Sequence, residues 1–167
     1  MDDAPLEGSE LHRAVGLPAI ARHVGEEEIP WVKNSLTDAQ VRLLQARPED
    51  QMWVLQGRMA PGLRADRHRH TGPVLGFTQS GAWRYLEHDF VNRAGSYLYE
   101  PAGSVHTLSV LEDNEQPTEA YFVMYGEVLY LDDDDEITYV SNVQTNIDLY
   151  YQACESAGLP RPTAILS

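Results

Sequence analysis

Short apolar segments separated by turn residues make up most of the chain after Trp31. The segments are rich in β-branched and aromatic side chains, and Pro, Gly, Asn and Asp fill the gaps between them. They cover residues 41–46, 51–59, 73–79, 81–91, 95–100, 106–112, 119–132 and 136–141. Strands that recur about every 8–12 residues are typical of an all-β sandwich or barrel. Four consecutive aspartates at 132–135 predict a solvated turn between the last two strands.

The final segment, about 143–157, has a different period. Its apolar residues recur at the spacing of one helix face. They are Val143, Ile147, Tyr150, Tyr151 and Cys154. Gly158 and Pro160 follow as helix stop signals. We therefore expect a single domain over residues 31–167, closed by one α-helix, and an N-terminal arm over residues 1–30.

Composition and charge narrow the classes of function. The single cysteine, Cys154, excludes an internal disulfide and a cysteine-cluster metal site. A formal net charge of −14 repels phosphate backbones and argues against a nucleic-acid partner. No apolar run approaches the ~20 residues of a membrane span. The start "MDDAPLEGSELHR" lacks the basic and apolar regions of a secretory signal. We therefore expect a cytoplasmic protein without a membrane partner.

Two histidines, His68 and His70, are separated by one residue just before the segment 73–79. Alternate side chains of a strand share a face, so both imidazoles can point into the same interior. His106 opens a later segment after a Pro-Ala-Gly turn. Three neutral imidazoles suit a first-row transition metal such as iron, zinc, nickel or copper. A solvated loop with a chance pair of histidines is the alternative interpretation of "DRHRH".

The spacing around the histidines has two parts. In the first part, five residues separate Gly62 from His68, and ten separate His70 from Gly81. In the second part, five residues separate Gly95 from Pro101, and Gly103 and His106 follow. Together these parts resemble the double motif of the cupin superfamily. The resemblance implies a small double-stranded β-helix (jelly-roll) barrel with a metal inside.

Two positions differ from that motif. Val74 stands where a carboxylate is usual, and Val110 stands where an asparagine is usual. A site of at least three histidines is therefore expected.

Two longer stretches narrow the resemblance. "HRHTGPVLGFTQSGAWRYLEHDF" and "AGSYLYEPAGSVHTL" are similar to cupins of the dihydroxyacetophenone dioxygenase family, and the similarity extends over about residues 27–158. Members are non-haem Fe(II) enzymes that cleave a carbon–carbon bond of an aromatic α-hydroxyketone with O2, giving two carboxylic acids. The resemblance implies an Fe(II) site held by His68, His70 and His106, although zinc or another first-row metal is possible. It also implies a homodimer or homotetramer.

The same family has a carboxylate near the metal, and the resemblance points to Glu87 as a ligand and catalytic group. His88 is the alternative, because strand alternation prevents both from facing inward unless the strand bulges. Glu100, which precedes the Pro-Ala-Gly turn, is a second catalytic candidate that could orient a ligand imidazole or accept a substrate proton.

Aromatic residues at strand spacing are candidates for an apolar substrate pocket. Trp83 and Tyr85 are predicted to contact substrate, and Arg84 could pair with a phenolate or carboxylate. Further candidates are Tyr97, Tyr99, Phe122 and Met124.

Two other functions fit the same motif. The first is a non-catalytic metal-binding cupin, such as the metal-binding domains of anti-sigma factors, which would hold zinc. The second is a metal-dependent isomerase or lyase. Fold alone cannot separate these functions, because function belongs to the site. Iron content together with O2 consumption discriminates between them.

Overall fold

The computed structural model describes residues 21–167, so the first 20 residues of the predicted arm lie outside the described residues. Two short 3-10 helices, η1 (Glu26–Glu28) and η2 (Pro48–Asp50), precede the first and third strands. The strands are β1 (Val32–Lys33), β2 (Gln40–Arg47), β3 (Met52–Met59), β4 (His68–His70), β5 (Val74–Ser80), β6 (Ala82–Tyr85), β7 (Asn92–Arg93), β8 (Tyr97–Glu100), β9 (Val105–His106), β10 (Leu108–Val110), β11 (Thr118–Tyr125), β12 (Val128–Leu131) and β13 (Ile137–Ser141). The chain closes with α2 (Val143–Ser156).

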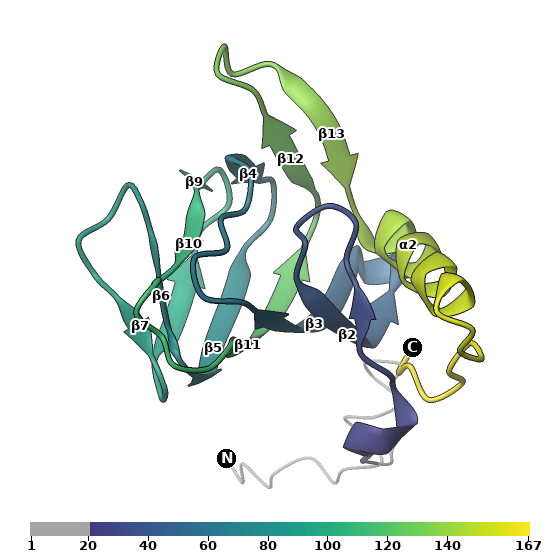
Figure 1. Cartoon of the computed structure of the whole chain (residues 1–167). Helices are drawn as coiled ribbons and strands as arrows, with labels where there is room; N and C mark the ends of the chain where they lie inside the picture. The colour runs from purple at the N-terminus through teal and green to yellow at the C-terminus, as the bar shows by residue number, and fades with distance from the viewer. Residues whose placement is uncertain (1–20) are drawn as a thin grey trace, which may run out of the picture.

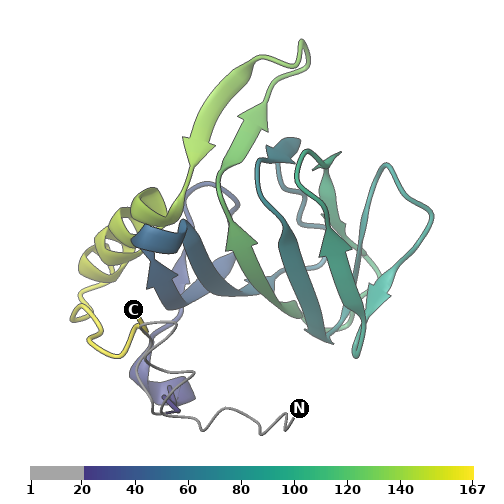
Figure 2. The same ribbon diagram turned by 180° about the vertical axis from the view of Figure 1, so that it is seen from behind.

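The strands form three antiparallel sheets that fold over one another (Figure 1). The largest has the order β1-β2-β3-β11-β5-β8, the second β13-β12-β4-β9 and the third β10-β6-β7. Helix α2 packs beside β1 and β2. It lies at one end of the molecule, as the view from behind in Figure 2 also shows. The predicted all-β fold with one C-terminal helix is confirmed.

Helix α2 begins at a reciprocal cap. The Asn142 side chain accepts a hydrogen bond from the Thr145 backbone N–H at 3.0 Å, and the Thr145 hydroxyl accepts one from the Asn142 N–H at 2.8 Å. The buried face carries Val143, Asn146, Tyr150 and Cys154. The helix therefore occupies the range that its apolar period predicted.

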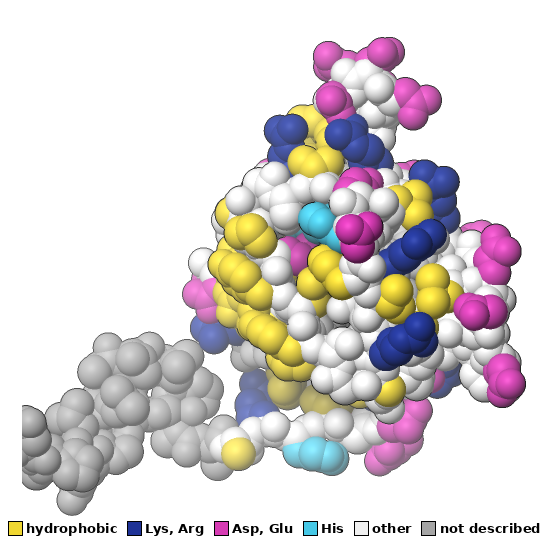
Figure 3. All heavy atoms as spheres, turned by 90° about the vertical axis from the view of Figure 1, so that its left-hand side faces the viewer, with side chains coloured by type: hydrophobic (Ala, Val, Ile, Leu, Met, Phe, Trp, Pro, Cys, Tyr) yellow, Lys and Arg dark blue, Asp and Glu magenta, His cyan; other side chains and the backbone are white. Residues whose placement is uncertain are grey.

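The hairpin of β12 and β13 projects from the body (Figure 1). Its tip carries the acidic run, which gathers at the top of the space-filling view in Figure 3. The Asp132 carboxylate accepts hydrogen bonds from the backbone N–H groups of Asp134 and Glu136, at 2.9 Å each. The predicted solvated turn is confirmed.

The predicted segment 119–132 is two strands rather than one. It divides at Gly126, after β11 in the six-stranded sheet and before β12 in the four-stranded sheet. Gly126 has φ +76°, and a Cβ there would lie 2.6 Å from the Thr71 hydroxyl. A Cβ on Gly72 would lie 2.3 Å from the Tyr125 carbonyl oxygen. Two chain segments thus cross at a distance that only glycine permits, and both change sheets there.

Two apolar clusters form the core. One lies between the six-stranded sheet and α2, where Trp53 and Leu43 pack with Tyr150 and Cys154. Ile29, which the sequence placed in the arm, is fully buried in this cluster. The second is centred on Trp83 and includes Tyr85, Leu108, Val110 and Ala120. No helix of the described residues is long and apolar enough to cross a membrane.

Candidate metal centre

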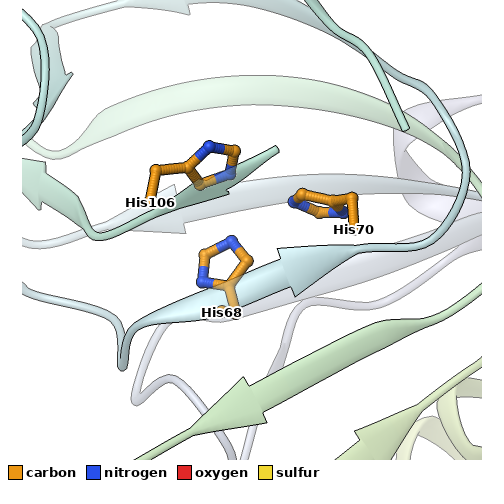
Figure 4. A group of neighbouring side chains, drawn as sticks. All are labelled: His68, His70 and His106. Atoms are coloured by element: carbon orange, nitrogen blue, oxygen red, sulfur yellow. The ribbon is translucent and has the colours of Figure 1, made fainter. Parts of the chain in front are cut away.

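Three histidines on two paired strands converge in the four-stranded sheet. His68 and His70 share one face of β4, and His68 is the direct cross-strand partner of His106 on β9. One ring nitrogen from each lies within 4.8 Å of the others. Figure 4 shows the three rings turned toward one another. These three histidines, the histidine group below, are those that the motif spacing predicted.

Burial keeps the imidazoles of His68 and His70 neutral. His70 and His106 are 4% and 1% exposed, and His68 is partly buried. Burial lowers the pKa of His70 to about 3 and also lowers the pKa of His68. The Nδ1 of His68 lies 2.8 Å from the Asp66 carbonyl oxygen, which can only accept. His68 therefore carries its hydrogen on Nδ1, and the lone pair on Nε2 is left for a cation.

Glu100 supplies a carboxylate to the histidine group. Its Oε2 lies 3.1 Å from the Nε2 atoms of both His70 and His106. Its Oε1 accepts a hydrogen bond from the Tyr85 hydroxyl at 2.5 Å. Burial raises the pKa of Glu100, but the interactions with His106, His70 and Tyr85 outweigh burial and hold the pKa below its usual value. Burial and the adjacent Glu100 raise the pKa of Tyr85, so its hydroxyl remains a donor.

The donor atoms present fit a divalent first-row metal. Within residues 21–167, the buried atoms Glu100 Oε2, His106 Nε2 and His70 Nδ1 have no hydrogen-bond partner. Buried polar atoms without a partner are rare, because each costs free energy. The pKa of Glu100 lies below its usual value, so its ionised carboxylate also leaves a negative charge in the interior. A cation bound by the histidines removes both costs, so the group can bind a metal.

Glu100 also accounts for the motif position that lacks its carboxylate. Val74 on β5 is the direct cross-strand partner of Glu100 on β8, so the two side chains project from one face. Val74 is 1% exposed and Glu100 3%. The negative charge expected at Val74 therefore comes from the neighbouring strand.

The structure does not bring Glu87 into the histidine group. Strand β6 ends at Tyr85, and Glu87 lies on the exposed loop that follows. Its Oε2 accepts a hydrogen bond from the Thr107 backbone N–H at 2.9 Å. His88 is also exposed, and its ring stacks on Phe90 with centroids 5.1 Å apart. Both residues follow the end of β6 because the predicted strand 81–91 is shorter than expected, and the Glu87 carboxylate lies near His106 without joining the three histidines.

A cavity of about 130 Å³ lies inside the barrel beside the histidine group. His68, His70, Tyr85 and Glu100 line one part of it. Inward-facing side chains of β2, β3 and β11 supply an apolar wall that includes Val41, Trp53, Leu55, Met59, Phe122 and Met124. The cavity can therefore hold an apolar molecule in contact with the histidine group.

Of the three residues predicted to contact substrate, one lines this cavity. Tyr85 does, and its ring stacks on His106 with centroids 3.7 Å apart. Trp83 is fully buried core, and its indole N–H donates to the Thr78 hydroxyl at 2.9 Å. Arg84 is exposed.

Among the further pocket candidates, Phe122 and Met124 line the cavity, whereas Tyr97 and Tyr99 are exposed. Sequence reasoning missed Trp53, Ser141 and Asn146, which also line it. No local signal marks these three residues, because their place depends on how distant segments pack.

A comparison with protein families gives one match. The sequence profile of the ChrR cupin-like domain matches residues 21–129, more than half of the chain. The chain belongs to the ChrR cupin-like domain family. A comparison with curated proteins gave no match.

Solved structures place this ChrR cupin-like protein among the cupins. An RmlC-like cupin protein from Ralstonia eutropha JMP134 is 32% identical, with a TM-score of 0.80 over 89% of this chain and 96% of that chain. A second protein with a cupin-like fold from the same organism is 28% identical, with a TM-score of 0.78 over 90% and 94% of the two chains. An acetylacetone dioxygenase from Acinetobacter johnsonii, 16% identical, shares the fold with a TM-score of 0.68 over 80% and 92%. The expected cupin barrel is thus confirmed.

Proposed function

We propose that this protein is a non-haem Fe(II) dioxygenase that cleaves a carbon–carbon bond of an aromatic α-hydroxyketone. The observation that carries the proposal is the histidine group with a buried carboxylate at 3.1 Å, beside an apolar cavity. The motif resemblance supplies the substrate class. The shared fold of an acetylacetone dioxygenase is in keeping with an oxygenase.

The reaction balances without a further co-reactant. The bond between the carbonyl carbon and the hydroxyl-bearing carbon breaks, and each carbon gains one oxygen atom of O2. An aryl hydroxymethyl ketone then gives an aryl carboxylic acid and formic acid. Iron held by His68, His70 and His106 would supply Lewis acidity and a common binding point for the ketone and O2.

Glu100 is suited to accept the proton of the substrate hydroxyl. Its Oε2 faces the histidine group without a hydrogen-bond partner among the described residues. The Tyr85 hydroxyl holds the other oxygen and so fixes the orientation of the carboxylate. A buried, oriented carboxylate is an effective general base when the acidic group lies within hydrogen-bond reach.

The cavity is suited to orient the ring of the substrate. Apolar side chains of β3 and β11 would contact the ring face. Tyr85 and the histidines form one end of the cavity. Such a wall also excludes water from the reacting carbons. Orientation of this kind contributes to rate because the reacting groups no longer have to find each other in solution.

Metal analysis and oxygen uptake test the proposal. Protein purified without an affinity tag should contain about one iron per chain and consume one O2 per ketone cleaved, measured by elemental analysis and an oxygen electrode on a panel of aryl hydroxyketones. Bound zinc, with no O2 uptake from any of them after iron loading, would contradict the proposal and favour a metal-binding module, an isomerase or a lyase.

A ligand variant tests the histidine group. His106→Ala should reduce the metal content to near zero, because it removes one of three imidazoles that converge on the site. Elemental analysis of the purified variant checks this. His88→Ala is the matched control, since His88 lies on the exposed loop. Near-stoichiometric iron in His106→Ala would refute the role of His106 as a ligand.

A further inference from the structure

The six-stranded sheet has one face toward the cavity and one face away from it. Phe122 on β11 and Val74 on β5 line the cavity. Alternate side chains of a strand point to opposite faces, so the residues next to these two point outward. The outward side chains of the last three strands of this sheet are Leu75, Phe77 and Gln79 on β5, Tyr97 and Tyr99 on β8, and Glu119, Tyr121, Val123 and Tyr125 on β11.

Six of these outward side chains form two continuous apolar rows. The rows are Tyr99–Leu75–Val123 and Tyr97–Phe77–Tyr121, in which neighbours are direct cross-strand partners. Cross-strand partners lie side by side on one face of a sheet. The rings of Phe77 and Tyr97, for example, have centroids 5.2 Å apart. The two rows together are called the outer apolar face below.

The outer apolar face stays exposed although it carries large side chains. Phe77, Tyr97 and Tyr99 are 45%, 58% and 57% exposed. Helix α2 packs beside β1 and β2, at the opposite end of the same sheet. Single exposed apolar residues are ordinary, but a contiguous group of them marks a surface that another molecule covers.

The distribution of charge selects the partner. A basic partner would be attracted to acidic surfaces such as the hairpin tip at 132–136, because the chain has a formal net charge of −14. The outer apolar face has no charged side chain, and the charge at its border is balanced, since Glu119 pairs with Arg58 at 2.8 Å. Two copies of this chain can therefore meet here without bringing like charges together.

A sheet face of this kind is suited to pairing with itself. A two-fold axis brings the same residues of both copies together. Two sheets that pack face to face lie about 10 Å apart, and their side chains interdigitate. Tyrosine rings contribute large apolar contact areas in such interfaces, while their hydroxyl groups can remain in contact with water.

We propose that the outer apolar face of β5, β8 and β11 is the interface of a two-fold symmetric dimer, in which the two copies pack sheet against sheet. This interface needs neither metal nor substrate, because its side chains lie on the side of the sheet away from the cavity.

Sedimentation equilibrium of the full chain tests the dimer and its position. The unaltered protein should have twice the mass of one chain at micromolar concentrations. Phe77→Ser removes apolar contact and Tyr97→Glu places two like charges across the axis, so each should raise the dimer dissociation constant by about tenfold or more. Phe90→Ser and Ile137→Glu are the matched controls, with exposed fractions of 44% and 55%, and should change it by less than about twofold.

Hydroxyl-radical labelling with mass spectrometry locates the interface without any substitution. Labelling of Tyr97 and Tyr99 should fall by about threefold or more between dilute and concentrated protein, because the dimer covers their rings. Labelling of Phe90, which is exposed on the loop after β6, should not change.

Each outcome decides for or against the dimer. Loss of labelling with concentration that is confined to the outer apolar face supports it, even if the variants fail to fold. A protein that stays monomeric at micromolar concentrations overturns it. A dimer that both Phe77→Ser and Tyr97→Glu leave intact has its interface elsewhere and also overturns it. A monomer in which Tyr97 and Tyr99 are protected at every concentration assigns the face to a segment of the same chain, such as residues 1–20, and likewise overturns it.

Discussion

A single carboxylate, that of Glu100, sets the charge of the interior beside the histidines. Its pKa lies below the usual value, whereas burial keeps His68 and His70 neutral. The Tyr85 hydroxyl engages one carboxylate oxygen, which leaves the other directed at two imidazoles. Only Glu100 therefore combines burial, charge and a free lone pair at this site.

Neutralising Glu100 should affect turnover more than neutralising Glu87. Glu100→Gln keeps the shape of the side chain but removes its basicity, so kcat for an aryl hydroxyketone should fall by about 100-fold or more. Glu87→Gln should stay within about threefold, because Glu87 is exposed and its carboxylate is held by the Thr107 N–H. Oxygen-electrode kinetics of the iron-loaded variants check both. A larger loss of kcat in Glu87→Gln than in Glu100→Gln would assign the near-metal role to Glu87.

Paired strands, rather than single segments, build the site. The motif leaves Val74 without a carboxylate, and the adjacent strand β8 provides one at Glu100, directly across the pair. His68 and His106 are related in the same way across β4 and β9. Cross-strand partners project from one face. A side chain needed at the site can therefore come from either strand of the pair.

Moving the carboxylate from β8 to β5 tests whether the two cross-strand positions are equivalent. Glu100→Val alone should weaken metal binding by about tenfold or more, because a buried group close to the ligands is lost. The double variant Val74→Glu with Glu100→Val returns a carboxylate to the other strand and should recover most of the affinity. Competition with a chromophoric chelator measures both. A double variant no tighter than Glu100→Val would show that the position on β8 is essential.

Local patterns in the sequence predict the elements but not their borders. The helix at 143–156 follows from its apolar period, and the three converging histidines follow from their spacing. The sequence marks the division only by the glycine itself, and its cause, the close approach of Thr71 and Gly72, depends on a distant segment. The end of β6 at Tyr85 likewise leaves Glu87 on an exposed segment after the strand, although the apolar pattern continues beyond Tyr85. Long-range packing decides such details.

At the scale of the whole molecule, the histidine group spans two short paired strands, β4 and β9. Strands β4 and β9 pair through His68 with His106 and Arg69 with Val105, and two backbone hydrogen bonds join His70 to Gly103 and Ser104. A metal bound by both strands adds a cross-link that exists only in the folded state. Any ligand that binds the native state alone stabilises it by mass action.

Metal loading should therefore raise the thermal stability. At a free metal concentration 100 times the dissociation constant, the stabilisation is about 2.7 kcal/mol. For a domain of this size, that corresponds to a rise in Tm of roughly 5–10 °C. Differential scanning calorimetry with and without a chelator checks the rise. His106→Ala should show none, and an equal rise in that variant would place the stabilising metal elsewhere.

The chain crossing at Gly72 and Gly126 connects the fold to the site. Gly72 lies two residues after His70, and Gly126 lies two residues before Val128, the strand partner of His70. A methyl group at either glycine would displace backbone, and the shift would pass directly to that imidazole. A saturation-mutagenesis library sorted for metal retention should therefore be depleted at 72 and 126 almost as strictly as at the ligands, although neither glycine offers the metal an atom.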